Sequence, residues 1–171
     1  GTEIKIMTVP YEFKGFMGMR NFVIEDTEGK KLAWANSNWT HLDISTGLPA
    51  RLTPADTDNY VLGEKMEMDY APRKIKLPED MIAQEAFTVQ KHHLDTNHHV
   101  NNCQYVCMAE DFLSESFKIY QMRAEYKMQA KLGDVICPKV KTETDKVVVS
   151  LDNIEGKAYA IVEFLKKEGD I

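Results

Sequence analysis

The stretch "HHLDTNHHVNNCQYV", residues 92–106, joins a crowded polar run to the start of an apolar periodic segment. Either Asn101 or Asn102 can cap a helix that begins there. At about 100° per residue, the next residues place their apolar side chains on one arc of a helix predicted over 100–115. That arc carries Tyr105, Val106, Ala109, Phe112 and Leu113. The stretch therefore predicts a polar loop that leads into a helix lying along a sheet.

Strand-like runs surround this helix. Residues 19–43 and 146–167 each contain two runs rich in β-branched or aromatic residues, joined at a glycine turn, which is typical of a β-hairpin. Further strands are expected at 2–13, near 85–92 and twice within 118–142. A sheet with one long helix belongs to the α+β class.

An internal similarity predicts the domain organisation. Glu28-Gly29-Lys30 recurs as Glu155-Gly156-Lys157, and Ala33 recurs as Ala160, at one constant offset. This spacing suggests two copies of one unit, although a common type of hairpin turn would explain it equally well. If the repeat is real, the first copy lacks its opening strand and its helix. The expected parts are a partial N-terminal copy (1–65), an extended linker (66–84) and a C-terminal copy (85–171).

Two features of the central region support this division. Thr53, Pro54 and Asp56 have the spacing of a helix start, so a short helix is expected from Thr53 to Gly63. The following residues, with Pro72 and Pro78 around a basic run, indicate an extended connection.

The composition excludes several classes of function. The chain has 171 residues, 43% of them hydrophobic, and a formal net charge of −6 with no long basic run, so no nucleic-acid partner is expected. No apolar stretch approaches the roughly 18 residues of a membrane span, and no membrane association is expected. Three cysteines without a disulfide framework favour a reducing, cytoplasmic location.

The polar stretch has three possible interpretations. A metal site is disfavoured, because adjacent histidines cannot easily face one ion and no metal-binding spacing occurs, so neither a metal nor a cofactor is expected. A solvated loop that merely caps the helix explains one asparagine but leaves the spacing Asp95-x-Asn97-x-His99 unused. The third interpretation is catalytic.

The catalytic interpretation rests on residue types beside a helix N-terminus. Such a terminus presents unpaired N–H groups and a partial positive charge that can hold an oxyanion. Asp95 can act as nucleophile or base, Asn97 can orient a carbonyl or a water, and His99 can carry a proton near neutral pH. A backbone N–H near Val100 is the expected oxyanion donor. Together these are the parts of an acyl-transfer site.

The run "DTNHHVNNCQYV" (95–106) resembles the Asp-x-Asn-x-His-Val-Asn-Asn-x-x-Tyr motif of acyl-acyl carrier protein thioesterases of plants and bacteria. Residues 15–52, "MDYAPRKIKLPED" (68–80) and "RAEYKMQAKLGDVICPKV" (123–140) are similar to other parts of the same family. The resemblance covers nearly the whole chain. It implies a tandem hotdog fold, whose N-terminal copy here lacks the first strand and helix.

The resemblance also implies an activity, the hydrolysis of fatty acyl-acyl carrier protein to free fatty acid in lipid metabolism. By position, Asp95, Asn97 and His99 match the catalytic residues of the family. A fourth catalytic residue, usually glutamate, falls at Gln129, which cannot accept a proton as a carboxylate would. An acyl-coenzyme A thioesterase and a non-catalytic acyl-binding protein are the alternatives.

The resemblance makes acyl carrier protein the expected partner. Carrier protein is acidic, so docking needs basic residues, and the candidates are Arg73, Lys74, Lys76 and Lys91, although a solvated linker explains them as well. A first copy without its helix would leave an apolar sheet face bare, and a second chain forming a homodimer is among the expected ways to cover it.

Overall fold

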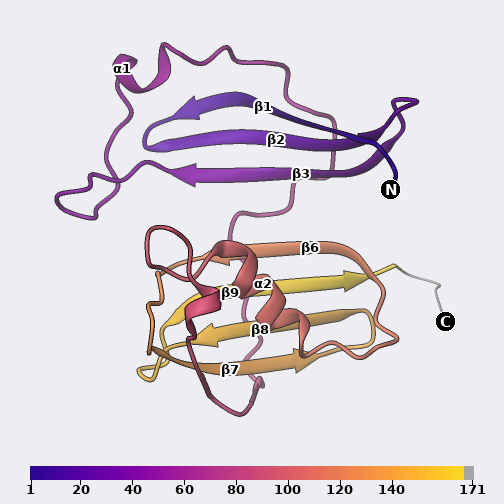
Figure 1. The fold of residues 1–171 in the computed structure, drawn as a ribbon, viewed down its shortest axis with the longest axis vertical. Helices are drawn as coiled ribbons and strands as arrows, with labels where there is room; N and C mark the ends of the chain where they lie inside the picture. Colours follow the sequence, from indigo (N-terminus) through magenta and orange to yellow (C-terminus); the bar gives the residue numbers. More distant parts are fainter. Residues whose placement is uncertain (168–171) are drawn as a thin grey trace. The chain divides into compact units, whose positions relative to one another are not determined.

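The computed structural model describes residues 1–167 and divides into two compact units, Gly1–Ala71 and Pro72–Ile171 (Figure 1). The division falls inside the stretch 66–84 that was expected to be a linker. None of the helices in the described residues is long and apolar enough to cross a membrane.

The first unit is a three-stranded antiparallel sheet with the order β1-β2-β3. Its elements are β1 (Ile4–Lys14), β2 (Met17–Asp26), β3 (Lys31–Thr40) and the single-turn helix α1 (Pro54–Thr57). The hairpin predicted within 19–43 is confirmed as β2 and β3. No helix other than α1 occurs in the described part of this unit.

The two faces of this sheet differ in what covers them. The fully buried Asn21 accepts hydrogen bonds from the Met66 N–H (3.0 Å) and the Tyr70 hydroxyl (3.2 Å), which hold the following chain against one face. On the other face Ile6 is 66% exposed and Trp39 is 58% exposed. Exposed apolar side chains therefore lie on the face opposite Asn21.

The second unit is a six-stranded antiparallel sheet with the path β4-β7-β8-β9-β6, and β5 also pairs with β7. Its elements are β4 (Ile82–Ala83), β5 (Phe87–Thr88), the 3₁₀ helix η1 (Lys91–His93), α2 (Asn102–Glu110), β6 (Ile119–Tyr126), β7 (Val135–Thr142), β8 (Lys146–Asp152) and β9 (Ala158–Lys166). The second predicted hairpin is confirmed as β8 and β9, and the two strands predicted within 118–142 as β6 and β7.

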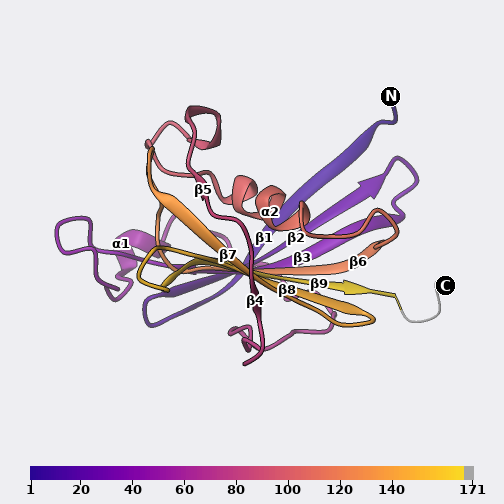
Figure 2. The same cartoon turned by 90° about the horizontal axis from the view of Figure 1, so that it is seen from below.

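Both faces of the central strands are buried, which explains why the sequence of β8 is a continuous run rich in valine. On one face Val149 and Val162 pack with α2 in the main core. On the other face Val148 and Ile161 pack against Ile75. Figure 2 shows α2 on one side of this sheet and the segment that leads into β4 on the other.

Hydrogen bonds and an ion pair fix that covering segment. The Ile75 N–H donates to a Glu125 carboxylate oxygen at 3.1 Å. The Arg123 guanidinium donates to the Pro72 carbonyl and forms a 2.7 Å ion pair with Glu163. The proline-rich stretch is thus extended as expected, but part of it is a packed layer of the second unit.

Three predicted elements are shorter in the structure than in the sequence-based prediction. Helix α2 ends at Glu110 rather than near 115. The N–H groups of Phe112 and Leu113 bond three residues back, and both side chains pack against the core. Of the strand expected near 85–92, only the two residues of β5 form a strand, and η1 follows them. The helix expected to run to Gly63 is the single turn α1, although its predicted start is correct, since the Asp56 carboxylate accepts from the Thr53 N–H at 2.8 Å.

Candidate active site

The polar stretch before α2 forms a short two-stranded ribbon. His99 pairs with Lys131 in an antiparallel bridge, and the Val100 N–H donates to the Ala130 carbonyl at 2.9 Å. The Asn101 N–H donates to the His93 carbonyl at 2.9 Å. Residues 94–101 are therefore held beside residues 129–131 and lead directly into the first turn of α2.

Asp95 closes the tip of this ribbon through its carboxylate. Its Oδ1 accepts hydrogen bonds from the Asn97 N–H at 2.8 Å and from the His99 N–H at 3.3 Å. The Asp95 N–H donates to the His99 carbonyl at 2.8 Å. The loop 95–99 thus orients the three residues of the predicted set around one carboxylate.

Two hairpin turns of the chain have the same hydrogen-bond pattern. Asp26 and Asn153 each accept from the N–H groups two and four residues ahead, and each donates its own N–H to the carbonyl four residues ahead. The fourth residue of each turn is a glycine with positive φ, Gly29 (+82°) and Gly156 (+77°). In the candidate site the fourth residue is His98, which holds φ at +61°.

His98 therefore carries backbone strain where the two related turns have glycine, since the left-handed region costs a residue with a side chain about 1–2 kcal/mol. We expect His98→Gly to raise the free energy of unfolding by about 0.5–1 kcal/mol, part of the relief being offset by the flexibility of glycine in the unfolded chain. Urea unfolding monitored by circular dichroism measures the change.

Gly156→Ala is the matched control for this prediction. An added Cβ at Gly156 meets nothing nearer than the Lys139 Nζ at 4.0 Å, so any loss of stability reports the positive φ alone. Gly156→Ala should lower stability while His98→Gly raises it. A destabilised His98→Gly protein would show that the His98 side chain makes a stabilising contact that outweighs the strain.

The carboxyl of Asp95 is ionised at neutral pH. Partial desolvation raises its pKa, but hydrogen bonds from the Asn97 and His99 N–H groups and from the Asn97 amide, together with the nearby His99 ring, lower the pKa below its ordinary value of 3.8. Its stabilising contribution is therefore complete above that ordinary value and is lost as the pH falls through the folded-state pKa.

The remaining predicted residues lie on the same ribbon. Val100 and Ala130 are buried, so the alternation of side chains places His99 and Gln129 on the outer side of the ribbon. His99 is half-buried, whereas Asn97 and Gln129 are exposed. The Gln129 amide makes no hydrogen bond to any residue within 1–167.

The expected role of Val100 is wrong. Its N–H is already bonded to the Ala130 carbonyl and cannot donate to an oxyanion. In the first turn of α2, the Cys103 N–H is capped by the Asn101 side chain at 2.8 Å, and the Gln104 N–H donates to the Asn101 carbonyl at 2.9 Å. Among residues 1–167 none accepts from the Asn102 N–H, which is left as the available donor at this helix end.

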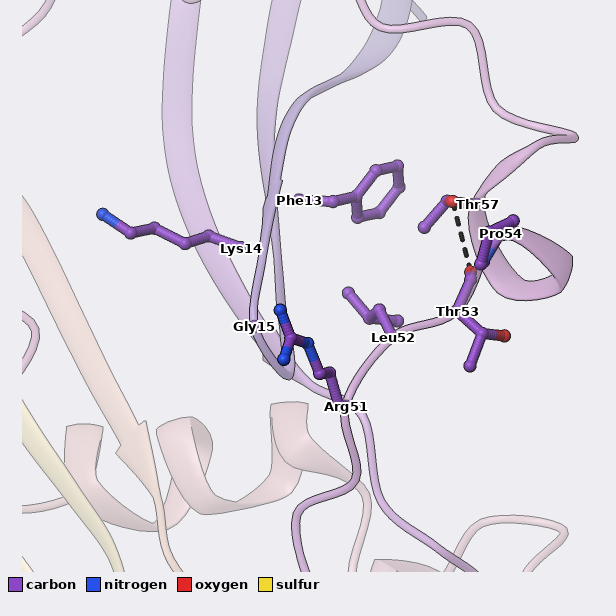
Figure 3. A pocket seen from close by; sticks show the side chains of 8 residues that line it. All are labelled: Phe13, Lys14, Gly15, Arg51, Leu52, Thr53, Pro54 and Thr57. Atoms are coloured by element: carbon purple, nitrogen blue, oxygen red, sulfur yellow. Dashed lines mark hydrogen bonds between the residues drawn. The ribbon is translucent and has the colours of Figure 1, made fainter.

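Two surface hollows are lined by residues other than those of this ribbon. One, of about 280 Å³, is shown in Figure 3 and is lined by the end of β1, Gly15, residues 51–54 and Thr57 of the first unit. The other, of about 320 Å³, is bordered by residues 133–135, 153–155 and Tyr159 of the second unit. None of the predicted catalytic residues lines either hollow.

The four basic residues considered for docking are divided between two places. Arg73, Lys74 and Lys76 belong to the segment that covers the face of the sheet opposite α2. Lys91 begins η1, directly ahead of the ribbon, and is exposed. Lys131, which the sequence analysis did not select, is also exposed and lies opposite His99.

Sequence reasoning missed two groups in this region. The Asn102 N–H could be recognised only after the true start of α2 was known. The Tyr105 hydroxyl, which accepts a hydrogen bond from the Ala130 N–H at 2.8 Å, was hidden because helical periodicity assigned Tyr105 simply to the buried arc. A buried tyrosine usually bonds through its hydroxyl, and that was the available signal.

An antiparallel sheet with α2 packed along one face has the arrangement of a hotdog fold. The model of the acyl-ACP thioesterase C-terminal domain matches residues 75–164, more than half of the chain. The chain therefore belongs to the acyl-ACP thioesterase family and is a thioester hydrolase of that class. No curated protein matches it in sequence.

Solved structures of the same class share its fold. An acyl-ACP thioesterase from Bacteroides thetaiotaomicron is 20% identical with a TM-score of 0.84, over 96% of this chain and 68% of that one. A 12:0-ACP thioesterase from Umbellularia californica is 17% identical with a TM-score of 0.80, over 96% of this chain and 67% of that one. At this identity the likeness concerns the fold.

Proposed function

We propose that the chain hydrolyses fatty acyl thioesters of acyl carrier protein at the ribbon formed by residues 94–101 and 129–131, with Asp95 as the nucleophile. The observation that carries the proposal is the Asp95 loop. It fixes an ionised carboxylate, an asparagine and a histidine within five residues, directly ahead of the N-terminus of α2.

The loop geometry around Asp95 favours nucleophilic attack over general base catalysis. The Asn97 and His99 N–H groups both donate to Oδ1, so the loop fixes the carboxylate and leaves its second oxygen free of these two bonds. The same carboxylate remains fully ionised and rigidly held, which suits attack on a nearby carbonyl carbon.

The proposed reaction has two steps. The free Asp95 carboxylate oxygen attacks the thioester carbonyl carbon, the Asn102 N–H and the Asn97 amide stabilise the oxyanion, and the carbon–sulfur bond breaks. The departing thiolate takes a proton from His99. Water then attacks the acyl-aspartyl anhydride, gives its proton back to His99, and releases the fatty acid and the Asp95 carboxylate.

Gln129 is proposed to orient water rather than to activate it. Its amide can donate and accept hydrogen bonds but cannot take up the proton of the attacking water. It lies on the outer side of the ribbon with His99, where a carboxylate would be well placed to stabilise the protonated form of that ring.

We expect Gln129→Glu to raise kcat about threefold to tenfold, because the added carboxylate supports protonation of His99. Steady-state thiol release measures the change, and Gln129→Ala, which removes the amide proposed to orient water, should lower the rate. An unchanged rate in both variants would show that the side chain at position 129 takes no part in the reaction.

Release of the carrier thiol tests the proposed function. Purified chain is incubated with acyl-acyl carrier protein, and the free thiol is followed with a chromogenic disulfide. The expected result is release proportional to protein concentration, whereas complete absence of release would favour a non-catalytic acyl-binding protein.

Acyl-coenzyme A is the parallel substrate. Turnover of the carrier-protein substrate should fall more steeply with salt than turnover of acyl-coenzyme A if exposed lysines such as Lys91 and Lys131 attract the acidic carrier.

The cytoplasmic location and the homodimer expected from the sequence stay predictions. The homodimer gains some support from the exposed apolar side chains of the first sheet, Ile6 and Trp39. Light scattering across a range of protein concentrations would measure the oligomeric state.

A further inference from the structure

We propose that Tyr105 is a positioning residue for thioester hydrolysis, whose buried hydroxyl holds residues 129–131 against the first turns of α2. The inference rests on the proposed function, because it concerns how the parts of that site are kept together. It assigns a role to a side chain that the mechanism above does not use.

The hydroxyl lies at the centre of a buried hydrogen-bond chain. Tyr105 is 2% exposed, and its oxygen accepts from the N–H of Ala130, which is fully buried, at 2.8 Å. The carbonyl of the same Ala130 accepts from the Val100 N–H at 2.9 Å. One residue thus ties the ribbon both to α2 and to the strand that carries His99.

The other bonds of this segment do not reach α2. The Met128 N–H donates to the Tyr159 carbonyl on β9 at 3.2 Å, and the Lys131 N–H donates to the Asp134 carboxylate within its own turn at 2.8 Å. In the described residues, Tyr105 is the only side chain of α2 that bonds to residues 128–131. The Tyr105 hydroxyl therefore acts with the Val100–Ala130 backbone bond to set the position of Gln129 relative to the helix N-terminus.

Removing the hydroxyl leaves a buried N–H without an acceptor, and residues 129–131 can relieve this only by shifting away from α2. The Tyr105 ring would stay in the core and keep its packing. Small displacements of this kind in a catalytic constellation reduce turnover more than binding, since the reacting groups lose alignment while the acyl chain and carrier are still held.

Tyr105→Phe tests the proposal, with Tyr159→Phe as the matched control. Tyr159 is also a buried residue (8% exposed) and its hydroxyl donates to Asp134 at 3.2 Å, so both variants lose one phenol hydrogen bond in the same unit. We expect Tyr105→Phe to lower kcat about tenfold with KM changed less than twofold, and Tyr159→Phe to leave both within about twofold.

Amide exchange gives a readout independent of activity. Exchange of the Ala130 N–H should accelerate about tenfold or more in Tyr105→Phe relative to Tyr159→Phe, with the α2 amides unchanged. Equal kcat and equal Ala130 exchange in the two variants would overturn the positioning role. Asp95→Asn is measured in parallel: if it is inactive and Tyr105→Phe behaves as the control, only this inference fails, whereas an active Asp95→Asn removes the proposed function and this inference together.

Discussion

Asp95→Asn should lower kcat for acyl-acyl carrier protein by about 10³-fold or more, because it removes the proposed nucleophile. The substitution is chosen to spare the loop. An asparagine oxygen can still accept from the Asn97 and His99 N–H groups, as the Asn153 side chain does in the related hairpin turn. Thiol release under saturating substrate measures the effect.

Asp95→Ala separates the chemical role of Asp95 from its structural role. The alanine variant loses both loop hydrogen bonds and should be less stable than Asp95→Asn, while both are equally inactive. If Asp95→Asn retained wild-type turnover, Asp95 would be only a loop-closing residue, equivalent to Asp26 in the turn between β2 and β3.

His99→Gln should lower kcat about 10²-fold, the typical contribution of a general acid and base. The loop should survive, because His99 joins it through backbone groups: its N–H donates to Asp95 and its carbonyl accepts from the Asp95 N–H. His92→Gln is the matched control. His92 is an exposed neighbour outside the ribbon, and its replacement should change kcat less than twofold.

The pH dependence of the same variants gives a second readout. The pKa of Asp95 is held below its ordinary value of 3.8, so Asp95 stays ionised from pH 5 to 9 and adds no inflection there. If His99 transfers the proton, any inflection of kcat that the wild-type chain shows in this range should be absent in His99→Gln. An inflection that persisted in this variant would assign proton transfer to another group.

The sequence predicted the strands of the hairpins well, because turn chemistry and strand alternation are local signals. Gly29 and Gly156 mark turns whose positive φ values suit glycine. The end of α2 could not be predicted in this way. Phe112 and Leu113 continue the apolar period of the helix, but they leave it to pack into the core, and tertiary packing decided the boundary.

In the candidate site, too, contacts between distant parts of the chain could not be predicted from the sequence. Asp95, Asn97 and His99 were recognised by spacing and by resemblance, and the structure gathers them in one loop. The assignment of Val100 was wrong because a single hydrogen bond to Ala130, some thirty residues away in sequence, occupies its N–H. Such pairing across the fold leaves no periodic or compositional signal.

The similarity of three loops also became visible only in the structure. Asp95–His99 repeats the bonding of the two hairpin turns, but histidine replaces the glycine that would have marked it as a turn of this type. A sequence search that recognises this type of turn by its glycine would therefore miss the loop that carries the proposed nucleophile.

Turnover in ¹⁸O-labelled water, followed by mass spectrometry of the 92–118 fragment, tests the central claim most directly. Trypsin can release this fragment, because Lys91 and Lys118 flank it. If water attacks the acyl carbonyl of the anhydride, no ¹⁸O enters Asp95. Hydroxylamine in a second sample would then trap the activated aspartyl group as a hydroxamate. The account predicts ¹⁸O or a hydroxamate on Asp95 after turnover, and neither in protein incubated without substrate. Substrate consumed with Asp95 unlabelled and untrapped would contradict nucleophilic attack and assign Asp95 to the base route.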